Sequence, residues 1–512
     1  MRKEKTPSYV LTLKLKTNDR DESILDKRFE ICRKLYNAVL GNGLKRFNTL
    51  KERKCYTKLR KELSEINKQF FNCKDEKKLK LINKQRKAKY KELTNLLNEF
   101  GINEYSLIND MTPMRLPFDD NIDNKTAQAL SSRAWKALND LIFGDAKSVS
   151  FKKQGDLYSV EGKWNASGIT YRDGIIKWNG LKLQIIVKKK DYYAKDALRD
   201  RVKYCRIKRE MIKGKYHYYI QLVLEGIPPI KCNRETGEIK RQTGKGKVGI
   251  DIGTRTIAYS SQYDVKLLEL SPKTNGIDRE LKLVQKKMDR SRRSTNPNKY
   301  NENGTIKRGN KDKWIKSKRY IKLSNHRKEL FRKQSEIRKQ EHNTLANELI
   351  QQGNEFYVET MNFKGLQKRA KNTTKNKNGK FNKKKRFGKS LKDKAPAMFL
   401  NILNNKLIWC NTKLNKIDTA KVKASQYNPL TDEYNKKKLS ERWNMFEYNN
   451  EEQKIQRDIM SAYVIMYVNS NLSTVNRQMC LDNYEAFKTL HDKEIERIKN
   501  YNTKIIGSMG IH

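Results

Sequence analysis

The feature that most constrains the fold of this chain is an apolar strand that runs directly into a carboxylate, within KVGIDIGTRTIAYSSQ at residues 247–262. Val248, Gly249 and Ile250 indicate a buried strand, and Asp251 follows them without a break. A carboxylate without a partner is costly at such a place. We therefore expect Asp251 to bind something at the end of this strand, or to repel something there.

Two more acids occupy similar positions in the second half of the chain. Glu359 ends the apolar strand 356–358, and Asp458 opens an apolar helix directly after Arg457. Mg²⁺ prefers carboxylate oxygens together with substrate phosphates, and two such ions about 4 Å apart hold the attacking water and the leaving oxygen of a phosphodiester. Together the three acids predict such a site. Singly, the alternatives are a helix cap for Asp458 and a structural ion pair for Glu359.

The charge of the chain indicates the kind of partner that this site serves. The sequence has 113 Lys and Arg against 58 Asp and Glu, a formal net charge of +55. Such an excess repels itself, and the phosphates of RNA or DNA neutralise it. The alternatives are a merely basic soluble protein and a disordered chain. The 36% hydrophobic residues, with 25 Tyr, 16 Phe and 6 Trp, argue for a folded chain.

Cysteine content and targeting patterns bear on location. The seven cysteines have no paired spacing, which favours reduced thiols over a disulfide framework. The first residues lack the apolar core of a signal peptide, and no apolar run is long enough to span a bilayer. We expect a cytoplasmic protein with no membrane partner.

The first half of the chain changes its hydrophobic period near Ser150. A strand at 8–17 precedes a helical stretch, and after Ser150 a period of two indicates β-hairpins at 160–190 and 206–226. A Pro pair and a polar stretch follow, which predict a domain boundary near residue 240.

The second half alternates strands and helices. We expect strands at 355–363 and 416–425, and helices at 315–350, 395–410 and 455–469. The basic stretch 291–314 is typical of a mobile loop. Residues 364–394, with fourteen Lys or Arg and one acid, indicate a disordered tract or a nucleic-acid contact.

The stretch around Asp251 also has a rival interpretation. Sugar kinases, actin and Hsp70-type ATPases carry a similar strand–Asp–x–Gly–Thr turn, which matches Asp251, Gly253 and Thr254. Those ATPases need a second Asp-Gly phosphate loop downstream, which we do not find, and they have no use for the lysine-rich residues 364–394. We therefore favour the nuclease interpretation.

Three segments in order carry a more specific resemblance: VGIDIGTRTIAYSS (248–261), FYVETMNFKGLQKRAK (356–371) and QRDIMSAY (456–463). They resemble the split RuvC nuclease domain of the transposon-encoded TnpB nucleases and the miniature type V CRISPR effectors. A basic helical insertion with His342 near its end is similar too, as is KVKASQY (421–427). The resemblance implies an RNA-guided DNA endonuclease in which Asp251, Glu359 and Asp458 are both the catalytic residues and the ligands of two Mg²⁺ ions.

The resemblance also implies the domain organisation. The fold would be α/β with α-helical and β-barrel parts: an RNase H-like RuvC nuclease domain, a helical recognition lobe and a small β wedge domain. The expected ranges are a first wedge strand at 1–20, the recognition lobe at 21–148, the wedge domain at 149–240, the nuclease domain at 245–480 with its basic helical insertion at 276–352, and a C-terminal helical tail at 481–512.

One departure from the family concerns zinc. Relatives usually carry two CxxC pairs before the third acid, but residues 424–457 contain no Cys and no His, so tetrahedral ligands are lacking there. We expect no structural zinc. Segment 424–454 would keep the position of the zinc ribbon with an apolar cluster in place of the metal, formed by Tyr427, Tyr434, Trp443 and Phe446.

The expected partners are a guide RNA and target DNA, held as an RNA–DNA heteroduplex with a displaced strand, and a homodimer on one guide is possible. Target binding would bring the protein to the bacterial nucleoid. Two alternatives stay open, a transposon-encoded TnpB-type enzyme and an RNA-guided repressor that does not cleave. The basic residues that we predict to contact nucleic acid are Arg327, Arg332, Arg338, Lys368, Arg369, Lys383, Lys384, Lys385, Arg386 and Arg457.

Overall fold

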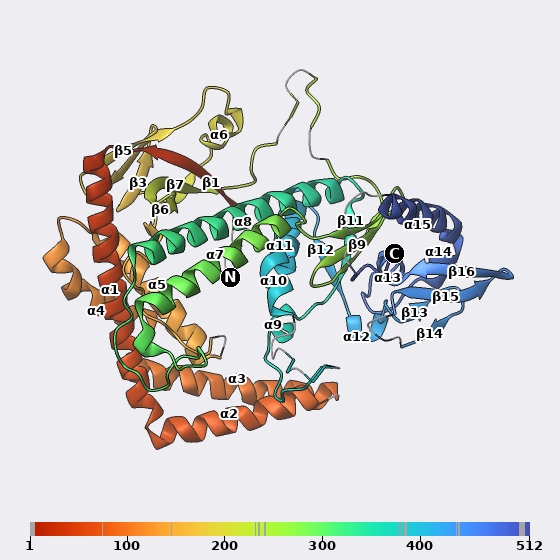
Figure 1. Cartoon of the computed structure of the whole chain (residues 1–512), viewed down its shortest axis with the longest axis horizontal. Coiled ribbons are helices and arrows are strands. Elements are labelled where there is room, and N and C mark those ends of the chain that lie inside the picture. Colours follow the sequence, from red (N-terminus) through yellow and green to blue (C-terminus); the bar gives the residue numbers. More distant parts are fainter. Residues whose placement is uncertain are drawn as a thin grey trace. The chain divides into compact units, whose positions relative to one another are not determined.

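The computed structural model of the chain divides into two compact units, Met1–Pro229 and Ile230–His512, close to the predicted boundary near residue 240 (Figure 1). Each unit is a mixture of helices and β-sheet and is described by itself. The described residues are 6–73, 75–144, 146–230, 232–233, 236–239, 242–376, 378–379, 381–382, 387–436, 438, 441–500 and 507–511.

The helices of the first unit pack around α1, which begins at a capping box formed by Asn18 and Asp21. Gly43 lets α1 approach its neighbours, because a Cβ atom there would lie 2.9 Å from the Leu138 side chain and 3.3 Å from that of Leu107. The helices are α1 (Asp19–Lys51), α2 (Lys54–Asn72), α3 (Glu76–Glu99), α4 (Glu104–Arg115), α5 (Asn124–Ile142), the short α6 (Tyr192–Ala197) and the 3-10 turn η1 (Leu116–Phe118).

The sheet of the first unit has seven antiparallel strands in the order β2-β6-β7-β1-β5-β4-β3. Its central strand is the predicted one at the start of the chain, and it alternates buried and exposed residues along its length. The predicted hairpins form, with the β6–β7 turn at Lys213-Gly214, both in the left-handed region. The strands are β1 (Ser8–Lys16), β2 (Ser159–Glu161), β3 (Ile169–Arg172), β4 (Ile175–Trp178), β5 (Leu181–Ile186), β6 (Val202–Ile212) and β7 (Lys215–Glu225).

The second unit is built on a mixed five-stranded sheet in the order β10-β9-β8-β11-β12. The first three strands form an antiparallel meander, and β11 runs parallel to both β8 and β12. The strands are β8 (Lys247–Ile252), β9 (Thr256–Ser260), β10 (Val265–Glu269), β11 (Glu355–Glu359) and β12 (Leu414–Ile417).

Helices cover both faces of this sheet. Val248, Ile250 and Phe356 point to one face, where they pack with residues of α8 (Lys318–Ile350) and α11 (Pro396–Trp409). The opposite face carries α13 (Arg457–Met466), and Gly249 determines how close that helix comes. A Cβ atom on Gly249 would lie 2.0 Å from the Ala462 carbonyl oxygen, so the helix backbone rests directly on β8.

The basic stretch between α7 (Thr274–Thr295) and α8 differs from the predicted mobile loop, because it contains an ordered arrangement. The Asn296 side chain bonds to both backbone groups of Ile315, and the 3-10 turn η2 (Pro297–Lys299) follows it. The buried Lys299 ammonium lies 5.0 Å from the Trp314 ring centre, and the Arg292 guanidinium lies 5.3 Å from it. Local polarity suggested mobility, but these tertiary contacts order the segment.

The predicted strand at 416–425 is wrong over most of its length. The strand β12 stops at Ile417, and Asp418 then caps the short helix α12 (Thr419–Val422) by accepting hydrogen bonds from two backbone N–H groups. The predicted helices at 315–350, 395–410 and 455–469 are confirmed as α8, α11 and α13. The remaining helices are α9 (Phe363–Leu366), α10 (Gly388–Lys394), α14 (Arg477–Asp482) and α15 (Tyr484–Lys499).

The segment before the third acid forms two small hairpins, β13 (Tyr427–Asn428) with β14 (Glu433–Tyr434) and β15 (Trp443–Tyr448) with β16 (Glu451–Gln456). The four aromatic residues predicted to form one cluster divide into two pairs. The ring centres of Tyr427 and Tyr434 lie 4.7 Å apart. Trp443 and Phe446 instead pack against the apolar core that includes residues of α13 and α15. Among the described helices none is long and apolar enough to cross a membrane.

Candidate active site

The sheet register brings Asp251 and Glu359 side by side. Val358 pairs with Ile250 across the parallel strands β11 and β8, and each acid is the next residue of its strand. Residues at equivalent positions of parallel neighbours point to the same face. That face is the one covered by α13, because Gly249 and Tyr357, two positions earlier, both pack against that helix.

Asp458 reaches the same region from the first turn of α13. Burial raises the pKa of the Asp251 carboxyl well above its ordinary value, and the nearby charges of Glu359 and Asp458 raise it further. Burial also raises the pKa of Glu359. Two acids are therefore held where their ionised forms are destabilised, which is the environment that a bound cation relieves.

Asp458 differs from the other two acids because two arginines accompany it. Arg457 Nη2 lies 3.2 Å from its Oδ1 atom, and Arg442 Nη1 lies 3.6 Å from its Oδ2 atom. Arg457 also donates to the Glu441 carbonyl oxygen at 3.1 Å. Within the described ranges no three His, Cys, Asp or Glu side chains form a ready-made metal-binding group. Asp458 is therefore paired with two arginines of the protein itself, Arg442 and Arg457.

The donor set nonetheless fits Mg²⁺. All three acids offer hard oxygen ligands. Ser461, one turn after Asp458 on α13, is fully buried, and its hydrogen bond to the Asp251 carboxyl opposes the rise in the pKa of that acid.

A cavity of about 360 Å³ lies beside Glu359 and is lined by three of the next four residues, by one side of α11 and by β12. Lys416 of β12 pairs with Val358, so it lies on the face of the sheet that α11 covers, opposite α13. Neither Asp251 nor Asp458 lines this cavity.

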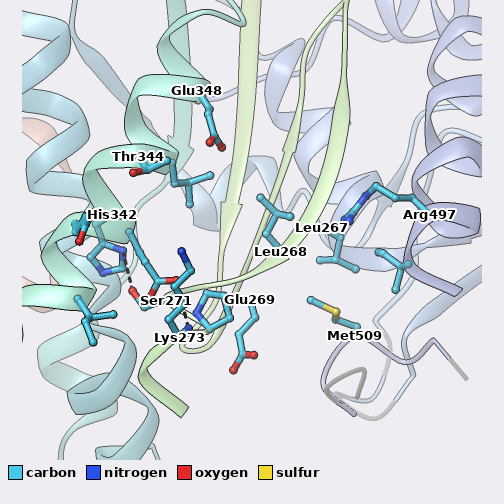
Figure 2. Close-up of a pocket in the computed structure, with 16 residues that line it drawn as sticks. Leu267, Leu268, Glu269, Ser271, Lys273, His342, Thr344, Glu348, Arg497 and Met509 are labelled. Atoms are coloured by element: carbon cyan, nitrogen blue, oxygen red, sulfur yellow. Dashed lines mark hydrogen bonds between the residues drawn. The ribbon is translucent and has the colours of Figure 1, made fainter. Parts of the chain in front are cut away.

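A second cavity of about 440 Å³ lies between β10, α8 and the residues around Met509, and none of the three acids lines it (Figure 2). His342 stands at its wall, with Nδ1 3.3 Å from the Ser271 hydroxyl and Nε2 2.8 Å from the Lys394 carbonyl oxygen. Burial lowers the pKa of His342 to about 4. This histidine is a neutral packing residue that joins α8 to its neighbours.

The residues predicted to contact nucleic acid have different surroundings. Arg332 lies between Glu329 and Glu336, and Arg338 donates to the carbonyl oxygens of residues 392 and 393. Lys368 and Arg369 are exposed and Arg327 is half-buried. Arg457 faces Asp458, as described above. Lys383, Lys384, Lys385 and Arg386 lie outside the described residues.

Three residues of the site escaped the sequence analysis. Arg442 lies sixteen positions before Asp458, and nothing in its local sequence indicates that the two meet. Ser461 was passed over as part of an apolar helix, and Gly249 as part of an apolar strand. A glycine inside a strand signals that another backbone approaches closely. For these three residues this was the one signal in the sequence.

Comparison with known proteins gives similarity at the level of structure only. No protein-family profile and no curated protein matches the chain in sequence. The structure is similar to that of a Cas12f1 protein in complex with sgRNA and target DNA, with 11% identity, a TM-score of 0.38, and coverage of 84% of this chain and 92% of that chain. It is also similar to a CRISPR-Cas12f ternary complex, with 13% identity, a TM-score of 0.22, and coverage of 88% and 85%.

Proposed function

We propose that this protein is an RNA-guided DNA endonuclease of the miniature type V effector kind, which hydrolyses phosphodiester bonds with two Mg²⁺ ions. The observation that carries the proposal is the meeting of Asp251 and Glu359 on adjacent parallel strands with Asp458 nearby. The three acids come from segments more than 90 residues apart in a chain of net charge +55. An all-carboxylate site in so basic a protein suits a phosphate substrate.

In this proposal each residue of the candidate site has its own role. Asp251, Glu359 and Asp458 would hold the Mg²⁺ ions, which supply Lewis-acid stabilisation and an activated water when bound. The sheet fixes the spacing of Asp251 and Glu359, and Gly249 fixes the distance of α13 and hence of Asp458.

A guide RNA would supply sequence recognition, and the protein would hold the heteroduplex by its backbone in the cytoplasm and at the nucleoid. The retained set of three acids favours cleavage over a repressor role. A TnpB-type enzyme is the alternative within the same chemistry, since the source of the guide lies in neighbouring DNA.

The first test is sequencing of RNA that co-purifies with the protein from a host carrying the native locus. A discrete RNA with a variable end is expected, and the source of its variable part separates a CRISPR effector from a TnpB-type enzyme. A smear of ribosomal and transfer RNA would contradict guided recognition.

The second test is cleavage of DNA matched to that guide. We expect Asp251→Asn, Glu359→Gln and Asp458→Asn each to lower the rate at least a hundredfold while guide binding persists. Asp173→Asn, at the exposed turn between β3 and β4, is the matched control and should retain full activity. Cleavage that survives Asp251→Asn would contradict the proposed site.

A further inference from the structure

The C-terminal segment 507–511 packs against the elements that hold Asp458. Met509 and Ile511 are buried in the same apolar core as Ile455 and Ile459, on either side of the start of α13. Gln456, the residue that caps α13, donates from its side chain to the Met509 carbonyl oxygen at 3.1 Å and accepts from the Ile459 N–H at 2.9 Å. The segment therefore holds the first turn of the helix that carries the third acid.

The same segment holds Arg442 on the other side of Asp458. The indole N–H of Trp443 donates to the Gly510 carbonyl oxygen at 2.7 Å. A Cβ atom on Gly510 would lie 2.2 Å from Cβ and 2.5 Å from Cγ of Arg442, so the glycine backbone rests on the root of that side chain. Gly510 also has a φ of +69°, which favours glycine over any other residue.

Arg442 is thus fixed at both ends. Its carbonyl oxygen accepts from the Arg457 N–H at 2.8 Å, and its guanidinium ends 3.6 Å from Asp458 Oδ2. A guanidinium in this position neutralises the carboxylate that a cation would bind. It also repels a second positive charge placed a few ångströms away.

From these contacts we propose that Arg442, seated by Gly510, is a positioning residue that competes with metal for Asp458, so that segment 507–511 sets the metal affinity of the site. The inference rests on the proposed function, because it takes the three acids as the metal ligands. In the metal-free protein the arginine orients Asp458. When metal binds, the guanidinium must turn away from Asp458, and displacing it lowers the apparent affinity.

The test is Mn²⁺ binding to the full-length protein, purified free of nucleic acid and followed by the electron paramagnetic resonance signal of free Mn²⁺. Arg442→Gln should tighten binding by about tenfold, because one unit of opposing charge is removed from the site. Arg442→Lys retains the charge and should stay close to the wild type. A purely structural role would instead weaken binding when Arg442 is replaced.

Gly510→Ala tests the contact between the Gly510 backbone and the Arg442 side chain. Its methyl group must displace Arg442, so we expect Mn²⁺ binding to tighten by about threefold, and the double variant with Arg442→Gln to bind no tighter than Arg442→Gln alone. Gly507→Ala is the matched control, since a Cβ atom there meets no atom of the described residues within 4 Å. If Gly510→Ala lowers the melting temperature so far that the protein is unfolded, Arg442→Gln alone decides the question.

The outcomes separate this inference from the proposed function. Wild-type binding that Asp251→Asn abolishes, together with unchanged or weakened binding in Arg442→Gln, overturns the inference and leaves the metal site intact. Wild-type protein that binds no Mn²⁺ at an Asp251-dependent site overturns both.

Discussion

At the scale of single residues, the environment of Asp251 predicts an unusual stability effect. Its pKa is raised by burial and by two neighbouring acids, so above that pKa the ionised carboxylate costs folding free energy. We expect Asp251→Asn to increase the free energy of unfolding of the metal-free protein by about 1 kcal/mol at pH 8. Denaturant unfolding of both proteins measures this difference.

The difference in unfolding free energy between Asp251→Asn and the wild type should depend on pH. As the pH falls through the raised pKa, Asp251 takes up a proton in the folded state, and the advantage of the variant should shrink. Added Mg²⁺ should stabilise the wild type and leave Asp251→Asn unchanged. A variant that is less stable at every pH would show that Asp251 has structural partners instead.

His342 predicts a second pH effect with the opposite direction. Its pKa in the folded protein, about 4, lies below the ordinary value of 6.5, so the unfolded chain takes up a proton first as the pH falls. Stability contributed by neutral His342 is complete above pH 6.5 and is lost toward pH 4, by about 3 kcal/mol.

The variant His342→Gln removes the titration and keeps an amide for the Lys394 carbonyl oxygen. The unfolding free energies of wild type and variant, measured from pH 7.5 to 4.5, should converge as the pH falls. His491, whose pKa burial also lowers, is present in both proteins and cancels in the comparison. Parallel curves for the two proteins would contradict this assignment.

At the scale of elements, the contact between β8 and α13 is the most sensitive in the second unit. Gly249→Ala would place a methyl group 2.0 Å from the Ala462 carbonyl oxygen and 2.4 Å from the Met466 nitrogen. Both are backbone atoms that cannot turn aside, so we expect a loss of about 3 kcal/mol in unfolding free energy, measured by thermal or denaturant unfolding.

Gly276→Ala provides the matched control for this substitution. Gly276 lies in α7, where a Cβ atom meets nothing within 4 Å, and alanine favours a helix by about 0.5–1 kcal/mol over glycine. The control should therefore be neutral or slightly stabilising. Equal losses in the two variants would rule out close helix packing as the cause.

The elements differ in how far the sequence alone could predict them. The strands that carry Asp251 and Glu359 and the helices α8, α11 and α13 follow from local hydrophobic periods in the sequence. The helix α12 depends on one capping side chain, Asp418, inside an apparent strand pattern. The order around Trp314 depends on cations drawn from both sides of a turn, which no local pattern records.

The candidate site was predictable to the same extent. Each acid could be recognised because it follows or opens an apolar element. The meeting of Asp458 with Arg442 could not be predicted, because it depends on the fold of the two hairpins and on Gly510, which lies 68 positions after Arg442 in the sequence.

At the scale of the whole molecule, the net charge predicts strongly salt-dependent RNA binding. We expect the logarithm of the affinity to fall linearly with the logarithm of the salt concentration. Lys368→Ala with Arg369→Ala should make that slope shallower by about 1–2 units, since both side chains are exposed. Arg332→Ala should leave the slope unchanged, because Glu329 and Glu336 already neutralise that side chain. Filter binding of the wild type and of both variants at several salt concentrations measures the slopes. A slope that changes only in Arg332→Ala would contradict this expectation.

The packing of the C-terminal segment has a consequence for engineering. Ile511 is buried and its neighbours hold Trp443 and Gln456, so a charged residue introduced at Ile511 would loosen the support of both Arg442 and the first turn of α13. Such a variant would carry every proposed metal ligand and still differ from the wild type in its apparent affinity for divalent cations.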